Sequence, residues 1–214
     1  MKIRILLLSI FISLSSSAQN FSLLANVNKA SYNIRTVEIK TGKITVILDE
    51  QGGISGIFDE LIDGNFDYIE SEEFPEIMGK LSSVNGTLIQ YYTGLDSQDI
   101  KYGKIKSIGD LAVEYFENKT EKDRYGKVKH IGDIQLDYWR RTGFDVTLVG
   151  KISRIGDIKI DYYNDQNDKT TYGQLKDIGP VHFSYWEDYY SSSMKVGRLR
   201  SLSGNSVAVT VKIF

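Results

Sequence analysis

The chain has 214 residues, 26 basic and 28 acidic side chains, and no cysteine. Its formal net charge of −2 argues against nucleic acid as a partner, because nucleic-acid-binding proteins carry a basic patch or stripe. Without cysteine the chain has neither a disulfide framework nor a lipid-carrying thiol. No later stretch matches the ~20 apolar residues of a spanning helix, so no transmembrane helix is predicted in the mature chain.

Residues 1–18 have the pattern of a secretory signal peptide. Lys2 and Arg4 give a positive start, residues 5–14 form an apolar run, and Ser16-Ser17-Ala18 is a small-residue cleavage site. We therefore expect an exported protein, located in the periplasm, at the cell surface or outside the cell after cleavage near Ala18.

Residues 19–55 are expected to hold an irregular N-terminal arm and the first strands. Residues 21–31 show no hydrophobic period, whereas residues 32–49 alternate apolar and polar positions, as strands with one buried face do. The run Gln51-Gly52-Gly53 then predicts a turn.

Residues 56–214 repeat one motif. Its clearest copy runs from Gly126 to Trp139 and reads GKVKHIGDIQLDYW. Copies open at Gly56, Gly79, Gly103, Gly126, Gly150, Gly173 and Gly197, at spacings that alternate between 23 and 24 residues. A fixed period of 20 to 50 residues is the mark of a repeat architecture. The sequence thus predicts seven repeats.

Each repeat is predicted to be a β-hairpin with a two-residue turn. Gly132-Asp133 and its equivalents, or Asn85-Gly86, suit such turns because glycine and asparagine tolerate positive φ. Counting outward from the turn places Gly126 opposite Trp139 and assigns Val128 and Trp139 to one face. The other face carries Ile131, Ile134, Leu136 and Tyr138.

The fold class is predicted to be all-β: tandem antiparallel hairpins in a continuous meander, preferably an open, twisted, elongated sheet. A parallel solenoid would stack Lys104, Lys127 and Lys151 as like charges about 4.8 Å apart, which is unfavourable. A closed outer-membrane β-barrel is the alternative, favoured by Phe214 after a strand-like run. Lysines on the apolar face oppose it, at about 2–4 kcal/mol each near the bilayer midplane.

The motif resembles tandem hairpin arrays of secreted bacterial proteins, written G-K-[IV]-x-x-I-G-[ND]-[IV]-x-[IL]-x-Y-[YFW], and the resemblance covers residues 79–186 well. That group implies no known activity. In architecture alone, the repeat is also similar to MORN repeats, whose G-x-G is missing here, and to the single-layer sheet of spirochaete outer-surface lipoproteins.

No residue pattern predicts a catalytic, cofactor-binding or metal-binding site. His130 and His182 are interpreted as polar positions on a sheet face rather than a metal pair or a general base. Asp133 and its equivalents suit turns. The row of Glu114, Asp137 and Asp161 is interpreted as surface charge, with an inverting carboxylate pair as the alternative. Residues 164–168 are interpreted as a solvated loop rather than a calcium site.

Aromatic residues at the end of each repeat are the candidate ligand-stacking residues. Rings exposed in a periodic row can stack on sugars or hold an extended polymer. Packing over glycines within the sheet is the alternative. The candidates are Tyr92, Phe116, Trp139, Tyr163 and Trp186.

These patterns predict an exported non-catalytic repeat protein that serves as a binding, adhesive or structural surface module. The alternatives are an outer-membrane pore and, less favoured, a glycan-active enzyme. A glycan, an extended polymer or another surface protein is the expected kind of partner, and no cofactor is expected.

Overall fold

The computed structural model describes residues 21–60, 64–143, 146–187, 194–204 and 206–214. The predicted signal peptide therefore lies outside the described residues. All regular elements in the described ranges are strands, so the predicted all-β class is confirmed. The described part of the chain contains no helical segment with the length and hydrophobicity of a membrane span.

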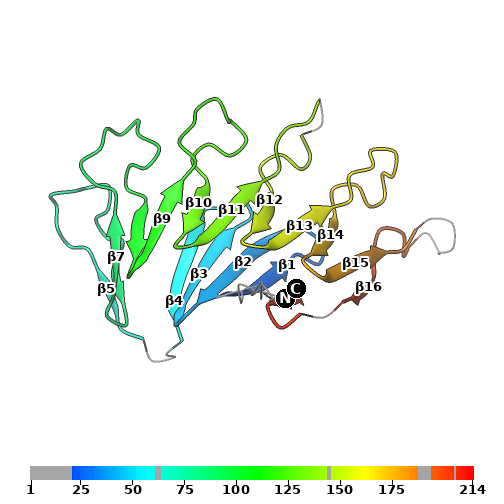
Figure 1. Ribbon diagram of the computed structural model, residues 1–214, viewed down its shortest axis with the longest axis horizontal. Coiled ribbons are helices and arrows are strands. Elements are labelled where there is room, and N and C mark those ends of the chain that lie inside the picture. The colour runs from blue at the N-terminus through cyan, green and yellow to red at the C-terminus, as the bar shows by residue number, and fades with distance from the viewer. Residues whose placement is uncertain (1–20, 61–63, 144–145, 188–193, 205) are drawn as a thin grey trace, which may run out of the picture.

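The repeats form one twelve-stranded antiparallel sheet in which each strand pairs with its neighbours in sequence (Figure 1). This repeat sheet confirms the predicted open meander, with edges at β5 and β16. Its strands are β5 (Phe66–Tyr68), β6 (Leu81–Val84), β7 (Thr87–Tyr91), β8 (Ile105–Ile108), β9 (Leu111–Tyr115), β10 (Val128–Ile131), β11 (Ile134–Tyr138), β12 (Ile152–Ile155), β13 (Ile158–Tyr162), β14 (Leu175–Ile178), β15 (Val181–Tyr185) and β16 (Leu199–Ser203).

The remaining strands form a five-stranded sheet in the order β17-β1-β2-β3-β4, here called the small sheet. They are β1 (Phe21–Val27), β2 (Ile34–Thr41), β3 (Ile44–Asp49), β4 (Ile54–Asp59) and β17 (Val209–Ile213). The strand β17 runs parallel to β1 and joins the two ends of the described chain. The strands and turn predicted over residues 32–53 are confirmed as β2, β3 and the β3–β4 turn.

The predicted irregular arm over residues 21–31 is wrong for its first part, which forms β1. Leu23, Ala25 and Val27 of this strand are buried. The alternation is masked in the sequence because Leu24, on the opposite face, is also apolar. Asn26 lies on that opposite face as well, and its amide donates to Thr36 and Glu38 on β2.

The turns of the central repeats agree with the sequence. Ile131 pairs with Ile134 across a two-residue loop, and Gly132 has a φ of +55°. In the Asn85-Gly86 turn both residues have positive φ, +49° and +75°. Local turn chemistry therefore sets the register next to each turn.

The predicted pairing of Gly126 with Trp139 is wrong. The N–H of Gly126 donates to the carbonyl of Phe116, in the preceding repeat, and Trp139 exchanges bonds with Gly150 and Lys151 of the next one. Hairpin pairing within a repeat ends two residues from the turn. The aromatic at the end of each repeat therefore closes the neck of the following loop.

The predicted position of Val128 is also wrong, because this residue is fully buried together with Ile131 and Tyr138. The register shifts between Val128 and His130 where β10 pairs with β9. This bulge moves Val128 to the core face, since one extra residue reverses the alternation along a strand.

The outermost copies of the motif form crossovers between the two sheets rather than hairpins. Gly56 lies in β4 of the small sheet, whereas β5 belongs to the repeat sheet. Gly197 precedes β16 of the repeat sheet, but the next strand, β17, belongs to the small sheet. The two degenerate copies thus mark the ends of the regular array.

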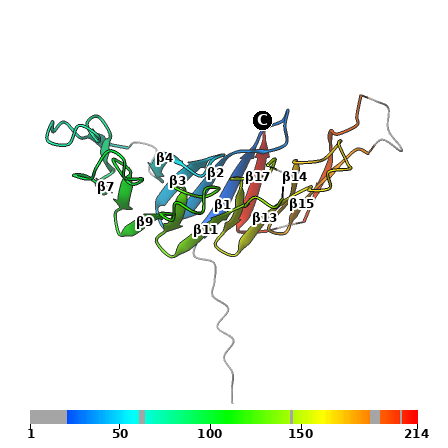
Figure 2. The same ribbon diagram turned by 90° about the horizontal axis from the view of Figure 1, so that it is seen from above.

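The two sheets pack face to face around a single core, and the repeat sheet curves around the small sheet (Figure 2). The core contains Val37, Ile39 and Val46 from the small sheet together with Leu136, Ile160 and Phe183 from the repeats. The meander is therefore one layer of a sandwich, with its loops projecting along one side (Figure 1).

Candidate binding groove

A lysine follows the first glycine of most repeats and links that repeat to the next. The ammonium group donates to the carbonyl of the glycine that opens the following repeat: Lys80 to Gly103 at 2.6 Å, Lys104 to Gly126 at 2.7 Å, and Lys151 to Gly173 at 2.9 Å. Lys127 instead donates to the carbonyl of Gln51 in the β3–β4 turn. Lys151 also donates to the side-chain oxygen of Asn33, directly before β2, at 2.8 Å. This lysine row therefore connects neighbouring repeats and, at two points, the two sheets.

Each of these lysines lies over the tyrosine that ends its own hairpin. The ammonium groups of Lys80 and Lys104 are 5.5 and 4.9 Å from the ring centres of Tyr91 and Tyr115. The Tyr91 hydroxyl donates to the Leu81 carbonyl at 2.8 Å, and the other hairpin tyrosines repeat this bond in three of the later copies. Lysine and tyrosine thus form one unit, held by a cation–π contact and a fixed hydroxyl.

Part of this row lines a groove between β4 and the inner face of β6–β9, with a volume of about 680 Å³. On one wall lie Asp49 and residues 51–57, from the β3–β4 turn to Ile57. The floor carries Lys80, Leu81, Tyr91, Lys104, Ile105, Tyr115 and Lys127, and the loop residues Ile100 and Tyr125 contribute to its rim. The groove exists because β4 is the edge of the small sheet and the repeat sheet continues past it.

The groove is electropositive. Lys80, Lys104 and Lys127 form no ion pair with any described residue. Burial lowers the pKa of Lys104 and of Lys127, the latter partly offset by the charge of Asp49. The carboxylate of Asp49 already accepts hydrogen bonds from the backbone N–H groups of Gln51 and Gly53. Lys104 and Lys127 are half-buried, whereas Lys80 is exposed. Partly buried cations without an acidic partner favour an anion from outside the chain.

The predicted ligand-stacking aromatics lie mainly against other repeats. Tyr163 donates to the Phe183 carbonyl at 3.0 Å, Trp139 to the Ile160 carbonyl at 3.3 Å, and Tyr92 to the Val113 carbonyl at 3.4 Å. Phe116 is buried, with the Arg124 guanidinium 4.2 Å from its ring centre. Trp186 has Lys195 and Arg200 over its ring. None of the five lines the groove, and ligand stacking on them stays a prediction.

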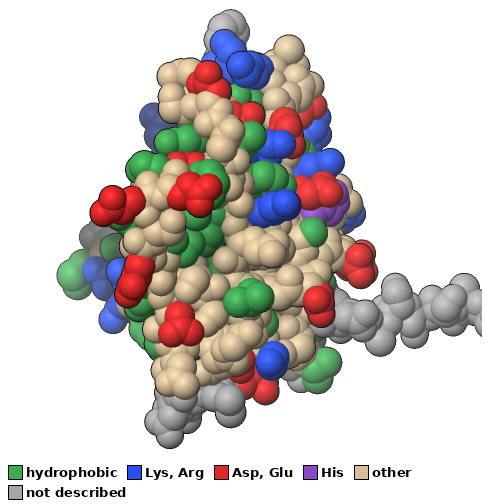
Figure 3. All heavy atoms as spheres, turned by 90° about the vertical axis from the view of Figure 1, so that its left-hand side faces the viewer, with side chains coloured by type: hydrophobic (Ala, Val, Ile, Leu, Met, Phe, Trp, Pro, Cys, Tyr) green, Lys and Arg blue, Asp and Glu red, His purple; other side chains and the backbone are tan. Residues whose placement is uncertain are grey.

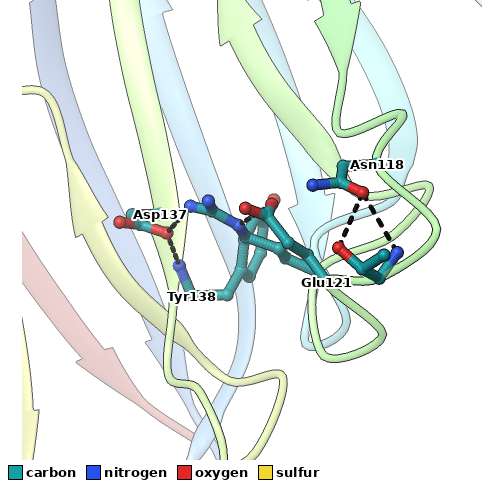
Figure 4. Close-up of polar contacts among 6 residues, drawn as sticks. Asn118, Glu121, Asp137 and Tyr138 are labelled. Atoms are coloured by element: carbon teal, nitrogen blue, oxygen red, sulfur yellow. Dashed lines mark hydrogen bonds and ion pairs between the residues drawn. The ribbon is translucent and has the colours of Figure 1, made fainter.

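The polar groups considered for catalysis lie on strands and in loops, and two of them, Asp137 and Asp161, line one shallow pocket beside Trp139. Asp137 accepts bonds from Arg124 at 3.1 Å and from the N–H of Tyr138 at 2.9 Å (Figure 4). His182 faces Asp177 as predicted, with Nδ1 2.7 Å from its carboxylate, while His130 contacts Glu114. In the described residues no cluster of three or more His, Asp or Glu side chains could hold a metal ion.

Sequence reasoning did not find the groove. The motif contains its signal, a lysine immediately before an inward apolar residue, but this pattern also suits a solvated lysine. The site requires the edge of β4 to lie over the repeats, which no local pattern encodes.

No family model matches the chain, and neither the curated proteins nor the solved structures contain a significant match.

Proposed function

We propose that the protein is an exported, non-catalytic binding module that holds an anionic ligand in the groove between β4 and the repeat sheet. The observation that carries the proposal is the set of groove lysines without an acidic partner among the described residues. Desolvation of a cation costs free energy that a bound anion would offset.

The arrangement favours an extended ligand over a small one. Lysines of successive repeats are two strands apart, which corresponds to about 9–10 Å. The groove is open along the sheet, so several repeats can contact one polymer. The ion pair of Asp137 with Arg124 supports a structural role for this carboxylate.

The experiment is calorimetric titration of residues 19–214 with two anionic probes, poly-L-glutamate and polygalacturonate, at low ionic strength. We expect at least one probe to bind, and the double substitution Lys80→Ala with Lys104→Ala to weaken binding by about tenfold or more. The matched control, Lys106→Ala with Lys159→Ala, removes the same charge from exposed positions outside the groove. It is expected to retain the affinity.

Loss of binding in both double variants would mean that net charge, not the groove, attracts the probe. No binding of either probe by the unmodified protein would contradict an anion-binding groove. In either case the proposed function fails.

A further inference from the structure

We infer that the ligand of the groove is an extended acidic peptide that pairs with the free edge of β4. This inference rests on the proposed function and names the chemical class of its ligand. Three independent features in or beside the groove support it: an unpaired strand edge, an uncovered apolar surface on β5, and cations at the end where the loops begin.

The first feature is the edge. The strand β4 pairs with β3 on one side only, and in the described chain no strand pairs with its other side. Edge strands present a row of unpaired N–H and C=O groups that can pair with an added strand. Residues 54–57 of β4 line the groove, so these groups are accessible from it.

The second feature is an apolar surface on β5, which does not line the groove but adjoins it where β5 pairs with β6. Phe66 pairs with Val84, and Tyr68 with Leu81, so both aromatic rings lie on the inner face of the repeat sheet. They are nevertheless 44% and 58% exposed, because the small sheet does not extend over β5. Hydrophobic side chains are visible at this end of the molecule among charged ones (Figure 3). A sixth strand beside β4 would cover this surface.

The third feature is charge. Lys80 and Lys104 immediately precede Leu81 and Ile105, so the cations lie at the loop end of the floor and the apolar side chains lie farther in. A peptide with apolar residues at its centre and a carboxylate at the end matches this order. The three groove lysines have only one acidic neighbour in the lining, Asp49.

A peptide fits the groove better than an acidic polysaccharide does. Sugars bind aromatic side chains by stacking on an open ring face, but lysine ammonium groups already lie over Tyr91 and Tyr115. A polysaccharide also cannot continue the hydrogen-bond ladder of β4, whereas strand addition uses the backbone for affinity and alternate side chains for specificity.

The probe is the blocked peptide Glu-Thr-Val-Thr-Val-Thr-Glu, which places both acids and both valines on one face in either strand direction. Only alternate N–H groups of an added strand bond to its neighbour. We therefore compare two methylated forms, one carrying N-methyl groups on the valines and one on the threonines. Strand addition predicts that one form binds like the parent and the other loses about tenfold or more.

Two further readouts accompany the titration. Replacing both glutamates of the probe by glutamine is expected to weaken binding about as much as the Lys80→Ala, Lys104→Ala variant does, because both remove the same contacts. Amide hydrogen exchange is expected to slow within residues 54–57 when the peptide binds, since pairing protects N–H groups at the edge.

The outcomes separate this inference from the proposed function. If both methylated peptides bind equally, or if only polygalacturonate binds and does so through Lys80 and Lys104, the groove is a binding site but strand addition is wrong. If the protein self-associates and the double variant is monomeric, the occupant is a second copy, and the inference is again wrong. If no probe depends on these lysines, both proposals fail.

Discussion

The glycines at the start of the repeats and at the turns are the residues with least freedom to change. Most have a φ between +55° and +82°, a conformation that costs an L-residue about 1–2 kcal/mol. The cost of a side chain also depends on the space around it. A Cβ on Gly52 would come within 2.3 Å of the Tyr138 ring, whereas one on Gly79 would meet nothing within 4 Å.

We predict that Gly52→Ala destabilises the protein more than Gly79→Ala. The two glycines have φ values of +78° and +77°, so the backbone strain is the same and the difference isolates the clash with Tyr138. Gly79→Ala should lower the free energy of unfolding by about 1 kcal/mol, and Gly52→Ala by a further 1–3 kcal/mol, roughly the range for overpacking. Urea unfolding measures both, and equal losses would contradict the packing of the β3–β4 turn on Tyr138.

Tyrosine burial predicts a loss of stability at alkaline pH. Burial raises the pKa of Tyr91 from 10.0 to about 12. Between these values the unfolded chain releases a proton that the folded chain keeps, so the free energy of unfolding falls as pH rises from 10 to 12. The Tyr91→Phe variant lacks this ionising group. Its free energy of unfolding, measured with urea, should therefore fall less between pH 10 and 12 than that of the unmodified protein. If the difference in unfolding free energy between the two proteins stayed constant over this range, the raised pKa of Tyr91 would be wrong.

At the scale of elements, successive hairpins are joined by side chain to backbone bonds as well as by the ladder. The lysine of one repeat donates to the carbonyl of the glycine that opens the next repeat. The aromatic residue that ends a repeat donates to a carbonyl in the second strand of the next repeat. Both bonds span 20 to 23 residues, which is close to the repeat period.

We predict that Tyr163→Phe lowers the free energy of unfolding by about 1 kcal/mol, the usual net contribution of one hydrogen bond. Its hydroxyl lies 3.0 Å from the Phe183 carbonyl. The matched variant Tyr92→Phe, whose bond is 3.4 Å long, should lose less. Thermal and urea unfolding of the pair check this order, and the reverse order would show that the hydroxyl bonds do not join the repeats.

The sequence predicted the elements better than their assembly. The turn at Gly132 and the order of the strands in the central repeats depend on local chemistry and were predicted correctly. The pairing of Trp139 with Gly150 was missed because a bulge between repeats shifts the register, and the bulge has no sequence signal of its own. The groove was missed because it depends on how far the small sheet extends over the repeat sheet, which is a tertiary property.

At the scale of the whole molecule, one core unites both sheets and predicts one cooperative unfolding transition. Removing residues 209–214 deletes β17, with the buried Val209, and uncovers β1. We predict that this truncation lowers the free energy of unfolding by about 3–5 kcal/mol, from the side-chain burial that is lost.

The control for the truncation is Thr210→Ala with Lys212→Ala, which alters only exposed side chains of β17 and should stay within about 0.5 kcal/mol of the original stability. Thermal unfolding by circular dichroism compares the three proteins. A truncated chain whose repeats unfold at the original temperature, in a separate transition, would show that the sheets are independent.

The parallel pairing of β1 with β17 also limits the order in which the strands can pair during folding. The open edge of β1, the first described strand, is filled only by β17, which lies almost two hundred residues later in the chain. A chain that emerges from its N-terminus can form hairpins one after another, but its second layer stays incomplete until the final strand arrives. The small sheet therefore becomes complete only when β17 pairs with β1.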